Sequence, residues 1–173
     1  MSKIETKRLI IRSFTPDDWK GVQALAIDRE SDRRDPGDPH EWPTSDEGCK
    51  AMAEFLSKRS DQFFAVCLKS DQKLIGLLAF NSIDKNKQLD LGHQIHTKYQ
   101  DNDHDKEALE SIIDFAFKNK DILSIETRNN PEWSEQLAPL KSLGLTPIEG
   151  RIGNLGITKA DWEKTRKQLR SIY

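Results

Sequence analysis

Residues 89–127 read LDLGHQIHTKYQDNDHDKEALESIIDFAFKNKDILSIET, and this stretch decides the class of fold. It begins at Leu89 with alternating side chains, which is typical of a strand with one buried face. The spacing of apolar residues over 105–119 predicts a helix, and the apolar run at 122–127 predicts a second, buried strand. Because a helix connects them, the two strands are expected to lie parallel.

Two further strands are predicted immediately before this stretch. Residues 63–68 and 74–80 are apolar and rich in β formers, and short polar turns at 70–72 and 84–87 follow them. Strands joined by such short turns form an antiparallel meander. Gly76 lies inside the second of these strands and indicates a β-bulge there.

The remaining predicted elements are short and flank this frame. An apolar run at 9–11 predicts a first strand, and Thr15 followed by Pro16 predicts a helix capped by Thr15. Thr158 lies three residues before Asp161, which predicts a last helix that opens with a capping box. Also predicted are helices over 45–60 and 131–143, the latter bent at Pro139 and ended by Gly144, and strands over 145–148 and 153–157.

A polar loop over 31–44 separates the first two predicted helices. Loops of this length are often functional, and here the loop is expected either to be anchored by His40 and Trp42 or to line a substrate mouth. The helix that follows is expected to bury three apolar side chains. These are Met52, Phe55 and Leu56.

The composition excludes several classes of protein. A length of 173 residues is typical of one domain, expected over 1–173, and two cysteines are too few for a disulfide scaffold. A net charge of −2 argues against a general nucleic-acid binder. No apolar run reaches the roughly 20 residues that span a bilayer, and residues 1–12 lack the pattern of a signal peptide. We therefore expect a cytoplasmic protein that binds neither nucleic acid nor membrane.

Four short motifs match one superfamily in the same order along the chain. They are IETKRLIIR (4–12), LIG (74–76), DLGH (90–93) and LGL (143–145). Together they resemble the GNAT superfamily of acetyl-CoA-dependent N-acetyltransferases, most closely the branch that acetylates ribosomal-protein N-termini and related amines. The resemblance implies an α/β (α+β) fold with a mixed, mostly antiparallel central sheet of six to seven strands and helices on both faces.

The resemblance also implies a reaction and a coenzyme. The protein would transfer an acetyl group from acetyl-CoA to a primary amine on a small molecule or a peptide, as a monomer or homodimer. Tyr99 and Glu107 match residues that bracket the coenzyme loop, where a diphosphate would rest against the amides of a helix N-terminus. The residues implied in coenzyme binding are Leu91, Gln100, Asp101, Asn102, Asp103, His104, Asp105, Lys106 and Trp133.

The coenzyme loop departs from the family pattern Q/R-x-x-G-x-G/A. Gln100 fits its first position, but Asp103 and Asp105 occupy the two positions of small residues, and Asp101 occupies a third that is often glycine. Small residues let the backbone approach the diphosphate with positive φ. Two like charges about 4 Å apart repel by roughly 1–4 kcal/mol. The sequence therefore predicts weakened coenzyme binding.

The same aspartates have two other interpretations. Aspartate near a helix N-terminus stabilises the helix through capping and the dipole, and we prefer this structural role to a catalytic one. Asp101, Asp103 and Asp105 also resemble the start of an EF-hand loop. However, Lys106 stands where that loop needs glycine and Ile112 where it needs glutamate, so no metal is predicted.

A second departure lies before the fourth predicted helix. There the family usually offers asparagine and, three residues later, serine, which contact the pantetheine and thiol region. This chain has Trp133 and Gln136 at those positions. The closing strands over 145–157 are also shorter than in many relatives, where they help to shape the acceptor site. A catalytically silent module of the same fold, which binds a small ligand or a protein partner, is therefore the second hypothesis.

Three residues are candidates for catalysis in an active enzyme. Asp90 or His93 would act as general base toward the amine, and Tyr99 would act as general acid for the leaving thiolate. Backbone N–H groups of the strand before the loop would polarise the thioester carbonyl. The structural alternatives are a strand-end charge for Asp90, a satisfied core histidine for His93 and a packing role for Tyr99.

Overall fold

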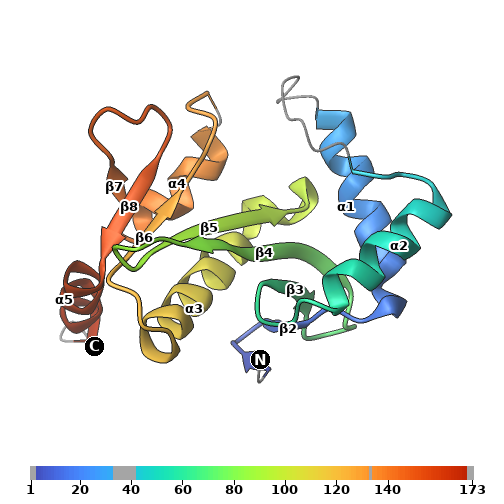
Figure 1. Cartoon of the computed structure of the whole chain (residues 1–173), viewed down its shortest axis with the longest axis horizontal. Helices are drawn as coiled ribbons and strands as arrows, with labels where there is room; N and C mark the ends of the chain where they lie inside the picture. Colours follow the sequence, from blue (N-terminus) through green and yellow to red (C-terminus); the bar gives the residue numbers. More distant parts are fainter. Residues whose placement is uncertain (1–2, 33–41, 133, 171–173) are drawn as a thin grey trace. The chain divides into compact units, whose positions relative to one another are not determined.

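The computed structural model describes residues 3–32, 42–132 and 134–170 (Figure 1). Contacts within the chain define two compact units, Met1–Ala79 with His93–Ala108 (unit 1) and Phe80–Gly92 with Leu109–Tyr173 (unit 2). The elements are β1 (Ile4–Glu5), β2 (Leu9–Ser13), η1 (Pro16–Asp18), α1 (Trp19–Asp32), α2 (Asp46–Ser57), β3 (Phe63–Leu68), β4 (Leu74–Ile83), β5 (Gln88–Ile95), η2 (Thr97–Asn102), α3 (His104–Asn119), β6 (Ser124–Thr127), α4 (Ser134–Ser142), β7 (Thr146–Pro147), β8 (Leu155–Thr158) and α5 (Lys159–Arg170).

The strands follow one hydrogen-bonded order, β1-β2-β3-β4-β5-β6-β8-β7. β5 and β6 are parallel, with Leu89 opposite Ile125, whereas the β2–β3, β3–β4 and β6–β8 pairs are antiparallel. The predicted α/β class and the mixed, mostly antiparallel sheet are confirmed, with eight strands in place of six to seven. The additional strand is β1, which is two residues long and too short to show a period. A single domain over 1–173 stays a prediction.

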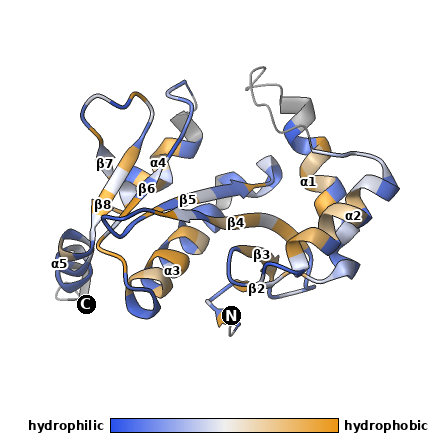
Figure 2. Ribbon diagram, viewed as in Figure 1, coloured by the Kyte–Doolittle hydropathy of each residue, from blue (hydrophilic) through white to orange (hydrophobic). Residues whose placement is uncertain are grey.

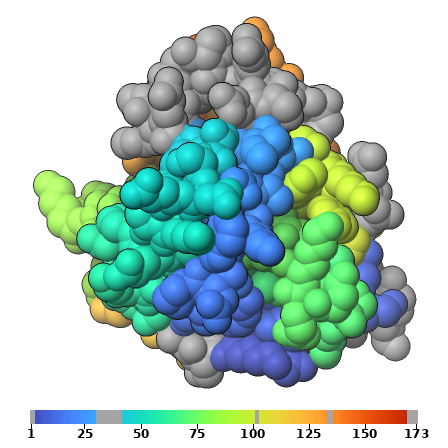
Figure 3. Space-filling model, turned by 90° about the vertical axis from the view of Figure 1, so that its right-hand side faces the viewer, coloured from blue at the N-terminus to red at the C-terminus, as the bar shows by residue number. Residues whose placement is uncertain are grey.

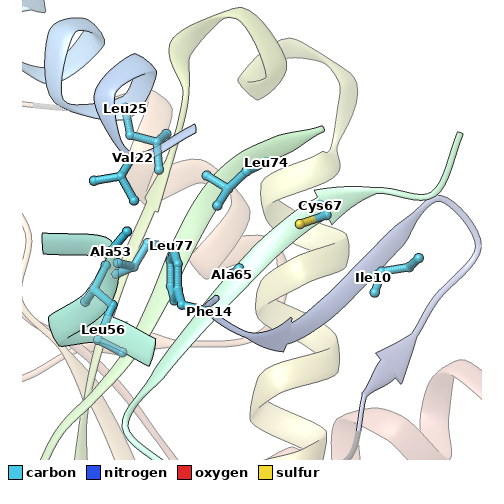
Figure 4. Packing of buried hydrophobic residues seen from close by; sticks show 11 residues of the cluster. Ile10, Phe14, Val22, Leu25, Ala53, Leu56, Ala65, Cys67, Leu74 and Leu77 are labelled. Carbon is cyan, nitrogen blue, oxygen red and sulfur yellow. The ribbon is translucent and has the colours of Figure 1, made fainter. Parts of the chain in front are cut away.

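In unit 1, α1 and α2 pack on one face of β2, β3 and β4 (Figure 4). Neighbouring residues along β3 and β4 are buried in succession, which means that both faces of these strands are covered, since successive side chains point to opposite faces. Figure 2 shows hydrophobic colouring along much of β4. The cluster under α1 and α2 comprises Ile10, Phe14, Val22, Leu25, Ala53, Leu56, Ala65, Cys67, Leu74, Leu77 and Ala79.

The predicted first helix begins at the expected place with Thr15 as its N-cap residue, through a 3-10 turn, η1, that precedes α1. The carboxylate of Asp18 accepts a hydrogen bond from the backbone N–H of Thr15 at 2.7 Å. It also binds both Nη atoms of Arg12 at 2.8 Å. Burial raises the pKa of Asp18, but the hydrogen bonds from Arg12 and Thr15 outweigh burial and leave it below its usual value. The chain therefore enters α1 with the strand before it clamped to the first turn.

Of the three residues predicted to face inward on the second helix, Leu56 is buried and Met52 is partly buried against the unit 1 cluster, whereas Phe55 is exposed. Cys49, Ala53 and Leu56 lie on its buried face, at helical spacing. Phe55 is 46% exposed, so the prediction that it points inward is wrong. Its position lies off this stripe, and its ring packs against Phe63 with a centroid separation of 6.1 Å. Most of the loop predicted over 31–44, including His40, lies outside the described residues, and α1 continues to residue 32.

The bulge predicted near Gly76 is confirmed by the register of β3 and β4. Val66 lies opposite Gly76 and Cys67 opposite Leu74, which leaves Ile75 as the extra residue. A Cβ at Gly76 would lie 2.7 Å from the carbonyl oxygen of Gln94, so only glycine allows the end of β5 to approach this closely.

In unit 2, the C-terminal helix α5 is attached to α3 by a buried indole. Trp162 is 2% exposed, and its Nε1 donates a hydrogen bond to Asp114 Oδ1 at 2.7 Å. One of the two bonds of the predicted capping box is present: Thr158 Oγ1 accepts from the backbone N–H of Asp161 at 3.1 Å, while its own hydroxyl donates to Asp161 Oδ2 at 2.6 Å. Pro139 lies inside α4, and Gly144 follows that helix with a φ of +94°. Within the described part of the chain, every helix is too short or too polar to cross a membrane.

Candidate functional site

The first turn of α3 is bound to the start of the chain through one carboxylate. Glu107 accepts hydrogen bonds from the hydroxyl of Thr6, from the backbone N–H of Arg8 at 2.7 Å and from Arg8 Nε at 2.6 Å. Burial raises the pKa of Glu107, but the hydrogen bonds from Thr6 and Arg8 outweigh burial and leave it below its usual value. The motif at residues 4–12 thus has a structural role, because it fixes the first turn of α3, where the candidate site begins.

The turn that leads into α3, residues 96–107, is also held by α1. Asp28 accepts hydrogen bonds from the backbone N–H of Thr97 at 2.9 Å and from its hydroxyl at 2.6 Å. His96 Nδ1 lies 3.3 Å from Asp28 Oδ1. Figure 3 shows α1 and η2 side by side on one face of unit 1. Sequence reasoning missed Asp28, because a single acid on an amphipathic helix carries no signal of a partner 69 residues away.

Tyr99 and Gln100 stabilise the same turn from inside. Gln100 Nε2 donates to the carbonyl oxygen of Ile95 at 3.0 Å, which closes the turn onto the end of β5. The ring of Tyr99 lies edge-on to His96 at 5.9 Å and to His104 at 6.1 Å between centroids. His104 Nδ1 lies 3.3 Å from the carbonyl oxygen of Tyr99. Tyr99 therefore has the packing role that was its structural alternative, and its role as an acid stays a prediction.

Asp103 adopts the backbone conformation that favours glycine. Its φ is +56° and its ψ is 18°, in the left-handed region, at the junction of η2 and α3. Aspartate tolerates this region better than most residues other than glycine. Its carbonyl oxygen accepts the hydrogen bond from the N–H of Glu107 at 3.0 Å that opens the helix. Asp103 therefore holds, with a carboxylate side chain, a conformation that glycine adopts without strain.

Asp105 places a buried carboxylate on the helix N-terminus. It is 8% exposed, and its Oδ1 accepts a hydrogen bond from the backbone N–H of Lys106 at 2.7 Å. Burial raises the pKa of Asp105, and the charge of Asp103 raises it further. An amide that would face a phosphate is thus already bound by a side chain of the same turn. The side chains of Asp101 and Asn102, and Trp133 as a whole, lie outside the described residues.

The other predicted site residues lie along β5. Leu91 is 1% exposed, so it is part of the core and its role in coenzyme binding stays a prediction. His93 is half-buried and belongs to unit 1. Asp90 belongs to unit 2, where its carboxylate pairs with Arg128 Nη2. The predicted roles of Asp90 and His93 as bases stay predictions.

A second carboxylate in unit 2 was not predicted. Glu126 of β6 is 6% exposed and accepts hydrogen bonds from three side chains. The donors are Gln88 Nε2 at 2.9 Å, Arg151 Nη1 at 2.6 Å and Asn154 Nδ2 at 2.5 Å. The signal in the sequence was a glutamate inside an apolar strand, which requires partners when it is buried. Its donors could not be found from the sequence because they come from a different strand and a later loop.

Known proteins share the sequence pattern of this chain. Residues 8–146 match the sequence profile of the acetyltransferase (GNAT) domain. The uncharacterized N-acetyltransferase YnaD of Bacillus subtilis (strain 168) is 26% identical over 142 residues, which are 82% of this chain and 81% of that protein.

Two solved structures have a similar fold. The ribosomal-protein-S5-alanine acetyltransferase from Vibrio fischeri gives a TM-score of 0.76 at 18% identity, over 94% of this chain and 99% of that one. Mycobacterium smegmatis RimJ, in complex with CoA-disulfide, gives a TM-score of 0.72 at 12% identity, over 94% of this chain and 88% of that one. At these identities the likeness concerns the fold. The match to the domain profile covers most of the chain.

Proposed function

Because the chain belongs to the acetyltransferase (GNAT) family, we propose that it transfers an acetyl group from acetyl-CoA to a primary amine. The acceptor is a small molecule or the N-terminus of a peptide, and the expected location is the cytoplasm. The names of its relatives support this reaction type, since YnaD is called an N-acetyltransferase and the RimJ structure contains a CoA compound. The chain's own support comes from the turn at residues 96–107.

That turn is the observation that carries the proposal. Asp28, Gln100 and Glu107 hold it from α1, from its own interior and from the start of the chain. Such anchoring is expected of a turn that presents helix N-terminal amides to an anion, because a preorganised site loses less entropy on binding. The left-handed conformation of Asp103 supports this proposal, since such a conformation lets a backbone approach a diphosphate closely. Residues 100–106 would hold the diphosphate through their backbone N–H groups.

The side chain of Asp105 opposes that fit. Its carboxylate competes for the amide of Lys106 and brings a negative charge to the turn. We therefore infer that the affinity for acetyl-CoA is low. The same observation favours the second candidate function, a silent module of this fold that binds a small ligand or a protein.

In the proposed reaction, acetyl-CoA supplies the acetyl thioester when bound. The carboxylate of Asp90 or the imidazole of His93 would take a proton from the amine, and the hydroxyl of Tyr99 would supply one to the thiol group that is released. Arg128 holds the carboxylate of Asp90 in a fixed orientation through its Nη2. His96 and His104 pack against the ring of Tyr99 and fix its position at the turn.

Isothermal titration calorimetry with acetyl-CoA tests the coenzyme part of this proposal. We expect weak but saturable heat, followed by an acetylated product in mass spectra when primary amines and peptides with free N-termini are added. A folded sample that gives no heat at millimolar acetyl-CoA and no product would favour the silent module. Binding of acetyl-CoA without an acetylated product from either class of amine would support the coenzyme site and contradict the transferase reaction.

A further inference from the structure

A buried carboxylate and a partly buried one lie on the adjacent parallel strands of unit 2. Asp90 of β5 and Glu126 of β6 are direct partners in the register of the sheet. Partners in adjacent strands point to the same face and lie close together. The side chain of Asp90 is 14% exposed and that of Glu126 is 8% exposed. Two adjacent anions this well buried require cations, because burial of an unpaired charge is costly.

Each carboxylate binds one arginine whose own side chain reaches the surface. Arg128 pairs with Asp90 and is 71% exposed, and Arg151 pairs with Glu126 and is 55% exposed. Within the described residues, each guanidinium uses one N–H in its pair, out of five available donors. The two carboxylates are therefore largely covered by protein, whereas the two arginine side chains are largely exposed to solvent. This face of unit 2 presents positive charge to solvent although its four charges sum to zero.

Arg128 is held by its pair with Asp90, and Arg151 is held by its pair with Glu126 and by the loop that carries it. Arg151 lies in the loop between β7 and β8, and that loop is fastened to Glu126 by Asn154 and to Asn129 through the carbonyl oxygen of Gly153 at 3.2 Å. Gly153 has a φ of +81°, and a Cβ there would lie 2.1 Å from the carbonyl oxygen of Asn129. The loop can therefore fold this tightly only with glycine at that position. Preorganised arginines lose less side-chain entropy when they bind an anion.

We propose that Arg128 and Arg151 together bind an oxyanion, either a carboxylate or a phosphate, of an acidic ligand. The planar guanidinium fork matches the paired oxygens of both groups, which a lysine does not. If the proposed function holds, this ligand is the acceptor, and the preferred amine carries an acidic group. Only that last identification rests on the proposed function; the oxyanion site stands on the geometry of unit 2.

Calorimetry of the full chain without acetyl-CoA, at low ionic strength, tests the site directly. Succinate and inorganic phosphate are the probes, and succinamide is the neutral analogue of matching shape. We expect saturable binding of at least one anion, none of succinamide, and weaker binding as salt is added. Tighter binding of succinate would indicate a carboxylate ligand, and tighter binding of phosphate would indicate a phosphate ligand.

Substitutions then assign the binding to the two arginines. Arg128→Gln and Arg151→Gln should each weaken the preferred anion about tenfold, the loss expected for one charge-assisted contact. Arg128→Lys and Arg151→Lys keep the charge and the ion pair but not the fork, and should give intermediate losses. Lys118→Gln is the matched control, because it removes one exposed charge from an ion pair on α3, and it should leave binding unchanged. A thermal melt of each variant verifies folding.

Several outcomes would overturn the proposal: equal binding of succinamide, unchanged anion binding in both glutamine variants, or an equal loss in Lys118→Gln. Its failure is distinguishable from that of the proposed function. Arginine-dependent anion binding without any acetylation would leave the site and remove the transferase. Acetylation without arginine-dependent anion binding would leave the transferase and remove the oxyanion site. Acetylation with no preference for acidic amines would remove only the identification of the ligand as the acceptor.

Discussion

The carboxylate of Asp105 is the single group whose removal should change coenzyme affinity most. Asp105→Ala frees the amide of Lys106 and removes a negative charge from the turn. Since like charges at contact repel by roughly 1–4 kcal/mol, we expect acetyl-CoA to bind about tenfold more tightly, as measured by calorimetry. Asp61→Ala removes the same charge from an exposed turn of unit 1 and should have no effect. Equal affinities in the three proteins would show that this carboxylate is not the obstacle.

The pH dependence of coenzyme binding should report on the same residue. Burial raises the pKa of Asp105 above its ordinary value of 3.8, so acidification neutralises it earlier than an exposed aspartate. Loss of that negative charge favours an anionic ligand. The affinity of the unaltered protein for acetyl-CoA should therefore increase as the pH falls toward the raised pKa, relative to Asp105→Ala measured in parallel. Parallel pH profiles for the two proteins would contradict this interpretation.

At the scale of elements, the carboxylate of Glu107 joins the first two strands to α3. Glu107→Gln keeps the shape but weakens the bonds to Thr6 and Arg8, and we expect a loss of about 1–2 kcal/mol in the free energy of unfolding at pH 7. Because the pKa of Glu107 is lowered in the folded protein, its contribution is complete above the ordinary value of 4.5 and is lost as the pH falls through the folded-state pKa. Urea unfolding at several pH values measures this difference.

The matched control for that substitution is Glu54→Gln. It alters an exposed pair with Lys58 on α2, in which both side chains are more than half exposed, and such pairs contribute little. The stability difference between the Glu107→Gln protein and the unaltered one should shrink at acid pH, while the control should differ little throughout. A pH-independent difference would mean that packing, and not charge, holds α3 at this point.

A buried indole contributes to the attachment of α5, beside the ion pair between Arg166 and Glu110. Trp162→Phe removes the bond from Nε1 to Asp114 and leaves a carboxylate without that donor, so we expect a loss of about 2 kcal/mol in urea unfolding. Trp19→Phe removes the same atoms from a partly buried indole that packs against the unit 1 cluster, and should cost less. A larger loss from Trp19→Phe would contradict the importance of the buried bond.

Local patterns predicted most elements, and the exceptions have physical causes. Thr15, Gly144 and Thr158 mark helix ends because capping depends on neighbouring residues alone. Phe55 was misplaced because a one-residue error in phase moves a side chain off a helical stripe. Within the site, the acidic turn was visible in the sequence, whereas the partners of Asp28 and Glu126 were not, because each arises from contacts between distant segments.

At the scale of the whole molecule, we expect one cooperative unfolding transition over 1–173. β4, β5 and α3 each continue from one unit into the other, so neither unit has a complete set of elements of its own. Unfolding followed by tryptophan fluorescence and by far-UV circular dichroism should give coincident curves. Two separated transitions would show that the units unfold independently and would contradict the prediction of a single domain.

The bond between Thr6 and Glu107 also constrains how the protein is made. The two residues are 101 positions apart, and the earlier one leaves the ribosome long before its partner has been synthesised. A nascent chain cannot complete the turn at residues 96–107 until α3 has emerged, and until then its first strand lacks the carboxylate that anchors it. Translational pausing shortly before residue 107 should therefore expose the amino-terminal segment to proteases or chaperones, whereas pausing beyond the end of α3 should protect it.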